Sequence, residues 1–217
     1  MAGPPHKQTL FIDGPAGRLE AIVETPKDAV FTGAAVVCHP HPQHGGTMHN
    51  KVAHQLARAF LKAGFAVLRF NFRGTEASEG TYDEGVGEVD DVLAALQWMR
   101  ERSGREDVWL AGFSFGAAVS VKAAVQTQLP GLVSIAPAVS RFARGLDRQP
   151  DCPWLILIGD KDELVDVNEM IGWVDTLAPG PELLVMPDAE HFFHGRLVEL
   201  RDHVVGFVTR SAQNSDA

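Results

Sequence analysis

The chain has 217 residues, and 28 acidic against 19 basic side chains give it a formal net charge of −9 at pH 7. This acidic balance argues against non-specific binding to nucleic acids or anionic membranes. Hydrophobic residues make up 45% of the chain and charged residues 22%, as is typical of a soluble globular protein. The length predicts one domain over residues 1–217.

Targeting and redox features point to the cytoplasm. The sequence has no apolar run long enough for a membrane span, which takes about 18 residues, and its first residues lack the apolar core of a signal peptide. The two cysteines, Cys38 and Cys152, lie at opposite ends of predicted strands, so we expect no disulfide between them. Unpaired cysteines fit a reducing compartment.

Predicted strands and helices alternate along the first half of the chain. A Gly-Pro-Ala-Gly segment separates two strand-like runs, which predicts an antiparallel hairpin. Buried strands are predicted from continuous apolar runs, and helices from apolar residues that recur on one face. These elements are a hairpin at 8–12 and 19–24, a strand at 34–38, a helix at 51–62, a strand at 65–70, a polar loop at 71–82 and a helix at 88–102.

The second half continues the alternation. Its predicted elements are a strand at 108–111, a helix after residue 116, strands at 132–136 and 154–158, a helix at 168–177, a strand at 182–186, a closing helix with its buried face at 197–207 and a frayed tail from 213. The whole pattern predicts an α/β fold. Its mostly parallel, twisted sheet has about eight strands and helices on both faces.

The most informative motif is Gly-Phe-Ser-Phe-Gly at 112–116, which reads G-x-S-x-G. It falls between a predicted strand and a predicted helix, the context of a nucleophile elbow. In such a turn the serine is held at positive φ while strand and helix crowd each other, so the two flanking positions must lack side chains. The motif predicts Ser114 as a nucleophile, although a serine that merely caps a helix is the simpler alternative.

The order of elements and several segments resemble the α/β-hydrolases, and in particular the small, lidless bacterial hydrolases related to dienelactone hydrolase. The matching segments are GPAGRLE (14–20), CHPHPQHGGTM (38–48), NFRG (71–74), GFSFG (112–116), GDKD (159–162) and EHFF (190–193). Dienelactone hydrolase itself uses a cysteine where this chain has Ser114. The resemblance implies the α/β-hydrolase fold without a cap domain, because only residues 137–153 lie where lids are usually inserted.

The resemblance also implies the partners of Ser114. Its pattern places the general base at His191, in the loop before the final helix, with His194 as the nearby alternative. The acid follows Gly159 with the family's spacing at Asp162, where it would orient the imidazole. Asp160 is the alternative because it lies nearer the end of the strand.

Backbone N–H groups are expected to form an oxyanion hole. Phe115 follows the nucleophile at a helix N-terminus, where the helix dipole also helps. The other donor should come from the loop after the strand at 34–38, in which Pro40 and Pro42 have no N–H. This leaves His41 as the first candidate, supported by the resemblance, and Gln43 as the next.

Three further sets of residues have more than one interpretation. Met48, Arg73 and Phe192 are candidate pocket residues, with Arg73 holding a substrate carboxylate or, as we favour, bracing its loop. Five histidines gather within sixteen residues and raise the possibility of zinc, but their spacing matches no metal motif. These histidines are His39, His41, His44, His49 and His54.

We therefore expect a serine hydrolase that cleaves a small-molecule carboxylic ester or thioester through an acyl-enzyme, without metal or cofactor. A peptidase or amidase would use the same groups. A non-enzymatic binding protein could keep the fold, although such proteins usually lose one of the three catalytic residues.

Overall fold

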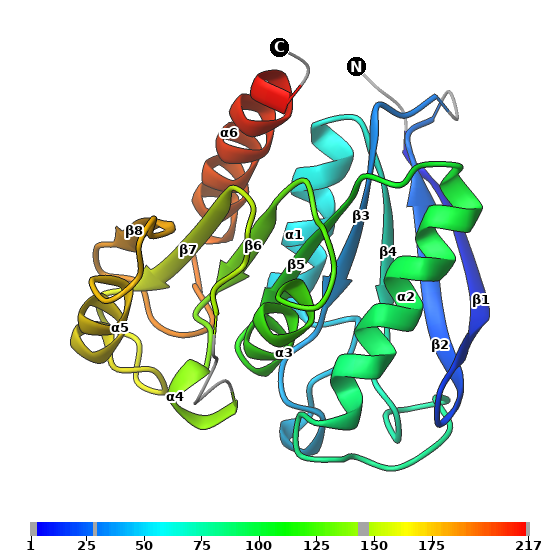
Figure 1. Ribbon diagram of the computed structural model, residues 1–217, viewed down its shortest axis with the longest axis horizontal. Helices are drawn as coiled ribbons and strands as arrows, with labels where there is room; N and C mark the ends of the chain where they lie inside the picture. Colours follow the sequence, from blue (N-terminus) through cyan, green and yellow to red (C-terminus); the bar gives the residue numbers. More distant parts are fainter. Residues whose placement is uncertain (1–3, 28–29, 143–147, 216–217) are drawn as a thin grey trace.

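The computed structural model describes residues 4–27, 30–142 and 148–215. An eight-stranded sheet runs through it in the order β1-β2-β4-β3-β5-β6-β7-β8 (Figure 1). The strands are β1 (His6–Gly14), β2 (Gly17–Thr25), β3 (Gly33–Cys38), β4 (Phe65–Phe70), β5 (Val108–Phe113), β6 (Leu132–Ile135), β7 (Trp154–Gly159) and β8 (Glu182–Met186). The predicted α/β-hydrolase fold is confirmed.

Only the N-terminal hairpin departs from the parallel arrangement. β1 pairs antiparallel with β2, and β2 pairs antiparallel with β4, whereas the pairs from β4 through β3 to β8 are parallel. Every residue of β3, β4, β5, β6 and β7 is buried. Strands covered on both faces read as continuous apolar runs, which is why they could be predicted.

Helices cover both faces of the sheet (Figure 1). α1 (Lys51–Lys62) packs against α6 (Leu197–Ser215) on one face, and α2 (Gly87–Ser103) packs against α3 (Phe115–Ala124) on the other. The shorter helices are η1 (Pro42–His44), α4 (Val139–Phe142) and α5 (Val167–Val174). Among the described residues, none of the helices has both the length and the apolar character needed to cross a membrane.

Two helix ends differ from the prediction. α5 ends at Val174 rather than at 177, because Thr176 N–H and Leu177 N–H turn back to the carbonyls of Trp173 and Val174. The last helix continues to Ser215, beyond the predicted start of a frayed tail at 213. Residues 216–217 of that predicted tail lie outside the described part of the chain.

The connection from β6 to β7 is short, as predicted. Its described residues hold α4 and no further helix or strand, and residues 143–147 lie outside the description. A cap domain is an insertion at this point, so the carboxyl ends of the central strands are left open.

Candidate active site

Ser114 occupies a strained turn between β5 and α3. Its φ is 54° and its ψ is −115°, in a region that residues other than glycine rarely adopt. A Cβ on Gly112 would lie 2.5 Å from the backbone of Gly116, and one on Gly116 would lie 2.2 Å from the carbonyl oxygen of His39. The absence of side chains at both glycines therefore lets strand, helix and the end of β3 meet around the serine.

A chain of hydrogen bonds leads from Ser114 to a carboxylate. His191 Nε2 lies 3.0 Å from Ser114 Oγ, and His191 Nδ1 lies 2.8 Å from Asp162 Oδ2. Because a carboxylate can only accept, Nδ1 carries the proton and Nε2 is free to accept from the serine hydroxyl. The side chains of His191 and Asp162 are 1% and 0% exposed, so water does not compete for this pair.

The second oxygen of Asp162 is held by the backbone. Oδ1 accepts hydrogen bonds from Leu164 N–H at 2.9 Å and from Val165 N–H at 2.8 Å. These bonds fix the plane of the carboxylate and direct Oδ2 at the imidazole. Of the two alternatives, His194 is exposed and contacts Glu190, and Asp160 Oδ1 has no hydrogen-bond partner among the described atoms.

Glu163 supports the histidine and was not predicted. Its Oε2 accepts a hydrogen bond of 3.1 Å from the backbone N–H of His191. The imidazole also packs against Phe113 and Phe192, with ring centroids 5.0 and 5.2 Å away. Glu163 lies in an acidic loop, and nothing in its sequence context separates it from its neighbours.

Phe115 and His41, the two predicted oxyanion donors, line one cavity with Ser114. Phe115 is the first residue of α3, and its ring centroid is 5.0 Å from that of His41, the residue before η1. Neither N–H has a hydrogen-bond acceptor among the described residues. The other candidate donor, Gln43, lies inside η1.

A cavity of about 440 Å³ opens at these groups. The loops after β3, β6, β7 and β8 line it together with the elbow. Its lining residues are Pro40, His41, His44, Gly45, Gly46, Asn50, Ser114, Phe115, Ala138, Ser140, Arg141, Phe142, Glu163, Leu164, Val165, His191 and Phe192. Of the three candidate pocket residues, Phe192 lies here, while Met48 and Arg73 do not.

Comparison with known proteins identifies the family and the type of hydrolase. The model of the X-Pro dipeptidyl-peptidase (S15) family matches residues 13–147. XC6422 from Xanthomonas campestris, an α/β serine hydrolase without lid, is 42% identical with a TM-score of 0.89, and the match covers 97% of each chain. The chain belongs to the S15 family and is an α/β serine hydrolase without a lid.

Two further relatives extend this similarity. An α/β serine hydrolase homologue from Coxiella burnetii is 45% identical with a TM-score of 0.86, over 91% of this chain and 95% of that one. An uncharacterized protein of Rickettsia prowazekii is 31% identical over 88% of this chain and 84% of its own length. The predicted resemblance to small, lidless serine hydrolases is confirmed by the solved structures.

Met48 and Arg73 do not line the cavity, so Met48 is not the predicted pocket residue and Arg73 has its favoured role as a loop brace. Met48 is 1% exposed and belongs to the packed interior. The guanidinium of Arg73 forms a buried bidentate pair with Asp91, through Nη2 at 2.7 Å and Nε at 3.0 Å. Asp91 also accepts a hydrogen bond from the backbone N–H of Arg73, so this arginine braces the loop after β4. Its guanidinium is already engaged by Asp91 and is not available to bind a substrate carboxylate.

Asn71 ties the loop after β4 to two other segments of the chain. Its Oδ1 accepts the N–H of Met48 at 2.8 Å, while its Nδ2 donates to Glu20 Oε2 at 2.8 Å. An amide can accept and donate at once, whereas a carboxylate here would face a second carboxylate.

His39 braces the same region in its neutral form. It is fully buried, donates from Nδ1 to the carbonyl of Pro40 at 2.6 Å and accepts the N–H of Phe72 at Nε2 at 3.0 Å. Burial lowers the pKa of His39 to about 4, because a charged imidazole would lose its hydration. The ring therefore ties the loop after β3 to the loop after β4.

The ring of His41 packs in the loop after β3. Tyr82 Oη lies 3.2 Å from its Nε2, and the ring packs among His44, Phe115 and Phe142. Burial, and then the nearby charges of His44 and Arg141, lower the pKa of His41 below its ordinary value. We expect a neutral ring at this position, which contributes packing and a backbone N–H.

The histidine cluster does not converge on one point. His39 is buried between two loops, His41 and His44 stack at the cavity, and His54 lies on α1. Across the described residues, no three His, Cys, Asp or Glu side chains are arranged to hold a metal ion. Both cysteines are free, and burial raises the pKa of each thiol to about 12, so neither is a thiolate at neutral pH.

Proposed function

We propose that this hydrolase cleaves a carboxylic ester or thioester through an acyl-enzyme on Ser114, with His191 as the general base and Asp162 as its orienting acid. The observation that carries the proposal is the pair of hydrogen bonds, 3.0 and 2.8 Å, that joins the three side chains at the floor of an open cavity. A serine with such a base is an activated nucleophile.

In the first half of the reaction, Ser114 Oγ attacks the acyl carbon and His191 Nε2 takes the hydroxyl proton. The carbonyl π electrons move onto oxygen, and the N–H groups of His41 and Phe115 stabilise this oxyanion. When the tetrahedral intermediate collapses, the bond to the leaving group breaks, and the proton on Nε2 passes to the departing alcohol or thiol. Asp162 stabilises the imidazolium without taking a proton.

Water completes the cycle by the same route. His191 takes a proton from water, the hydroxide attacks the acyl carbon, and the bond to Ser114 Oγ breaks as Oγ regains a proton from Nε2. The products are the carboxylic acid and the alcohol or thiol, and no metal or cofactor takes part. The open cavity gives water direct access to the acyl-enzyme.

An ester or thioester fits the cavity better than an N-terminal dipeptide. A dipeptidyl-peptidase must hold a free α-ammonium group, which calls for carboxylates in its site. Glu163 is the one carboxylate among the described lining residues, and it already accepts the N–H of His191. Arg141 adds a positive charge to the same cavity, which disfavours an ammonium group.

The peptidase remains the second candidate because the chain belongs to the S15 family, whose model is described as an X-Pro dipeptidyl-peptidase. Nitrophenyl esters, acyl thioesters and an X-Pro nitroanilide can be compared at one enzyme concentration. We expect turnover of the esters and thioesters. Turnover of the X-Pro anilide alone would reverse the assignment.

A fluorophosphonate tests the nucleophile independently of the substrate. It should attach to Ser114, which mass spectrometry of the peptide containing residues 112–116 would detect. Ser103→Ala is a matched control, since the Ser103 hydroxyl lies on α2 and only donates to backbone carbonyls. A folded protein that never reacts with the probe would favour a binding protein over an enzyme.

A further inference from the structure

Arg141 brings a positive charge to the cavity that contains Ser114. It lies in α4 and lines the same cavity as Ser114 and His191. Its guanidinium has no hydrogen bond or ion pair among the described residues. Other arginines are engaged by carboxylates, as in the buried pairs Arg69–Glu24 and Arg73–Asp91.

The surroundings of Arg141 are mostly apolar or uncharged, with Glu163 as the exception among the described lining residues. Leu164, Val165, Phe142 and Phe192 provide hydrocarbon surface, and Leu164 is 65% exposed although it is apolar. Among the described lining residues, Glu163 is the one carboxylate, and its Oε2 is occupied by the backbone of the catalytic loop. The titratable rings at the cavity are His41, His44 and His191.

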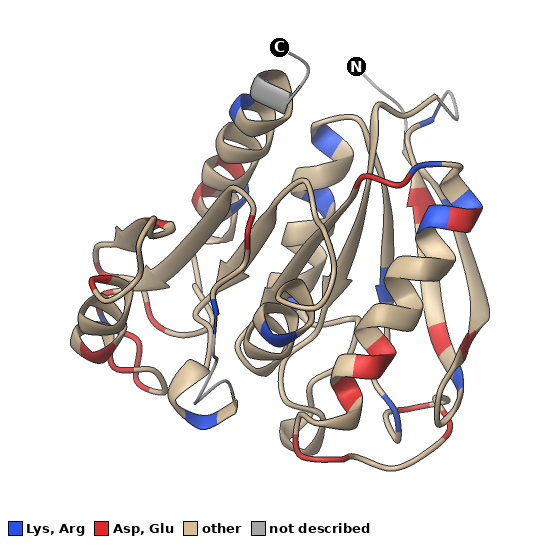
Figure 2. Ribbon diagram, viewed as in Figure 1, with Lys and Arg blue, Asp and Glu red and all other residues tan. Residues whose placement is uncertain are grey.

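The positive charge of Arg141 also stands out against the rest of the molecule. Acidic residues gather on α2 and in the loop before it, whereas α4 carries Arg141 and no acidic residue (Figure 2). With a net charge of −9, the protein as a whole repels anions. Arg141 lines the same cavity as Ser114 and has no partner among the described residues, so an anion would be attracted there.

We propose that Arg141 binds a carboxylate or phosphate group of the substrate, so that the hydrolase prefers esters or thioesters with a negative charge near the scissile bond. The inference rests on the proposed function, because it assigns specificity to the same site. The planar fork of a guanidinium binds either oxyanion through two parallel hydrogen bonds. The apolar lining would hold the hydrocarbon part of the acyl group.

Two matched substrate pairs test the proposal and separate the two sources of charge. The first pair is the coumarin monoester of adipic acid and its neutral methyl ester, which differ by a carboxylate on the acyl side. The second is the butyryl thioester of phosphopantetheine and that of pantetheine, which differ by a phosphate on the leaving group. The variants are Arg141→Gln, Arg141→Lys and, as a control, Arg102→Gln at the other end of the sheet.

We expect the wild type to prefer the charged member of one pair. Arg141→Gln should lower kcat/KM for that member by about 10- to 100-fold, the effect of losing a charge-assisted hydrogen bond, and leave the neutral member unchanged. Arg141→Lys should retain part of the preference, and Arg102→Gln all of it. High salt should weaken the preference in the wild type, since the cavity is open to solvent.

Other outcomes separate this inference from the proposed function. Equal kcat/KM within both pairs, or an equal loss for neutral and charged members in Arg141→Gln, would overturn the role of Arg141 while leaving the esterase assignment. If no ester or thioester is hydrolysed, the proposed function fails, and binding of adipate and of inorganic phosphate then tests Arg141 alone. In that measurement, affinity equal in wild type and Arg141→Gln overturns the inference.

Discussion

The two ends of the sheet use their backbone differently. Each described non-glycine residue with positive φ lies in a connection that follows the carboxyl end of a strand: Glu76, Glu84, Ser114, Ala136, Asp188 and Phe193. At the amino end, the positive-φ positions that follow α1 and α2 are Gly64 and Gly104. Glycine adopts this conformation without strain, whereas any other residue held there destabilises the folded state by about 1–3 kcal/mol.

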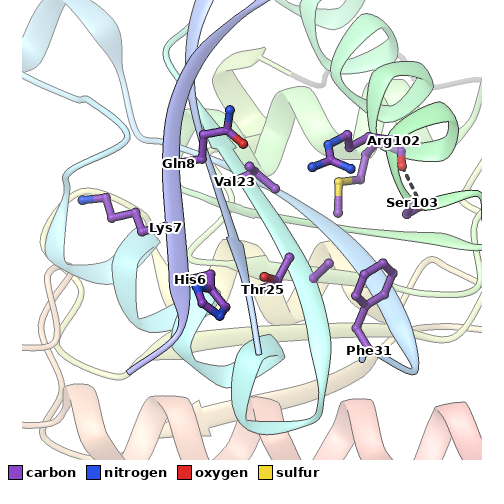
Figure 3. A pocket seen from close by; sticks show the side chains of 10 residues that line it. His6, Lys7, Gln8, Val23, Thr25, Phe31, Arg102 and Ser103 are labelled. Carbon is purple, nitrogen blue, oxygen red and sulfur yellow. Dashed lines mark hydrogen bonds between the residues drawn. The ribbon is translucent and has the colours of Figure 1, made fainter. Parts of the chain in front are cut away.

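The two ends also differ in their cavities. The amino end has a cavity of about 270 Å³ between the N-terminal hairpin and the end of α2, lined by His6, Thr25, Phe31, Arg102 and Ser103 among others (Figure 3). Its polar groups mostly bond to backbone: His6 to the carbonyl of Lys27 and Ser103 to that of Met99. At the carboxyl end, side chains bond to one another across loops.

This contrast shows where the fold concentrates strain and where it avoids it. In parallel α/β sheets the loops beyond the carboxyl ends of the strands converge, so groups far apart in the sequence meet there. Strained backbone at the non-glycine residues of that end, and relaxed glycines at the other, distinguish the end that holds Ser114 without reference to any motif. Variants at the two ends test this difference.

The largest effect is expected at the elbow. Ser114→Ala removes the nucleophile and should lower kcat on the order of 10⁶-fold, as in other serine hydrolases. Alanine also has one Cβ, so the backbone strain and the fold should be unchanged by circular dichroism. Ser103→Ala, at the amino end, should retain full turnover. A Ser114→Ala protein with wild-type turnover would move the active site elsewhere.

The next largest effect is expected at Asp162. Asp162→Asn presents an amide to His191 Nδ1, which favours the tautomer with the proton on Nε2 and prevents that nitrogen from accepting the serine proton. We expect a loss on the order of 10⁴-fold in kcat. Asp160→Asn is the matched control and should have kcat near that of the wild type. If the two losses are reversed, Asp160 is the acid.

A smaller effect concerns the pH dependence of stability. The pKa of His39 is about 4 in the folded protein, below the ordinary value of 6.5. Between pH 6.5 and 4 the unfolded chain therefore binds a proton at His39, whereas the folded protein does not. The contribution of neutral His39 to the free energy of unfolding is fully present above pH 6.5 and is lost as the pH falls toward 4. The difference corresponds to about 3 kcal/mol.

Urea unfolding between pH 4.5 and 7 measures this contribution. His39→Gln should be less stable at pH 7, because it loses one of the two hydrogen bonds, but its stability should fall less steeply on acidification. An unchanged slope would show that the pH dependence comes from other groups.

The smallest effect is expected at the amino end. Gly104→Ala places a methyl group in open space, so it should cost only about 1–2 kcal/mol for positive φ and leave kcat/KM unchanged. Gly116→Ala adds the same methyl group 2.2 Å from the carbonyl oxygen of His39, and should lower both stability and turnover. Thermal unfolding and ester hydrolysis of both variants compare the two ends directly.

Much of the fold could be predicted because its strands are buried on both faces. The predicted limits of β4 and β8 agree with the structure, and those of β3, β5, β6 and β7 differ by at most two residues. The helix ends were less predictable, as α5 and α6 illustrate. Where a helix ends depends on which backbone N–H groups bond to the carbonyl three residues earlier rather than four. The spacing of apolar residues does not show this.

The candidate site was predictable in part. The motif identified Ser114, and the resemblance identified Asp162 and His191, whose roles remain predictions although their side chains meet. Met48 was wrongly predicted as a pocket residue, since proximity to a matching segment does not tell which side of a loop faces the cavity. Arg73 has the loop-bracing role that we favoured over substrate binding. Glu163, Tyr82 and the neutral brace at His39 had no sequence signal, because their partners lie on other loops.

By itself, the sequence determined the α/β architecture, the elbow and its two glycines, since each of these depends on local spacing or on steric demands within five residues. The packing of the folded chain determines which charged side chains form ion pairs and which have no partner among the described residues. Arg73 and Arg141 both follow strands of the same sheet, yet Arg73 is neutralised by Asp91, whereas Arg141 lines the cavity with no partner among the described residues. That difference depends on a carboxylate brought from another helix, and so on the packing of the whole chain.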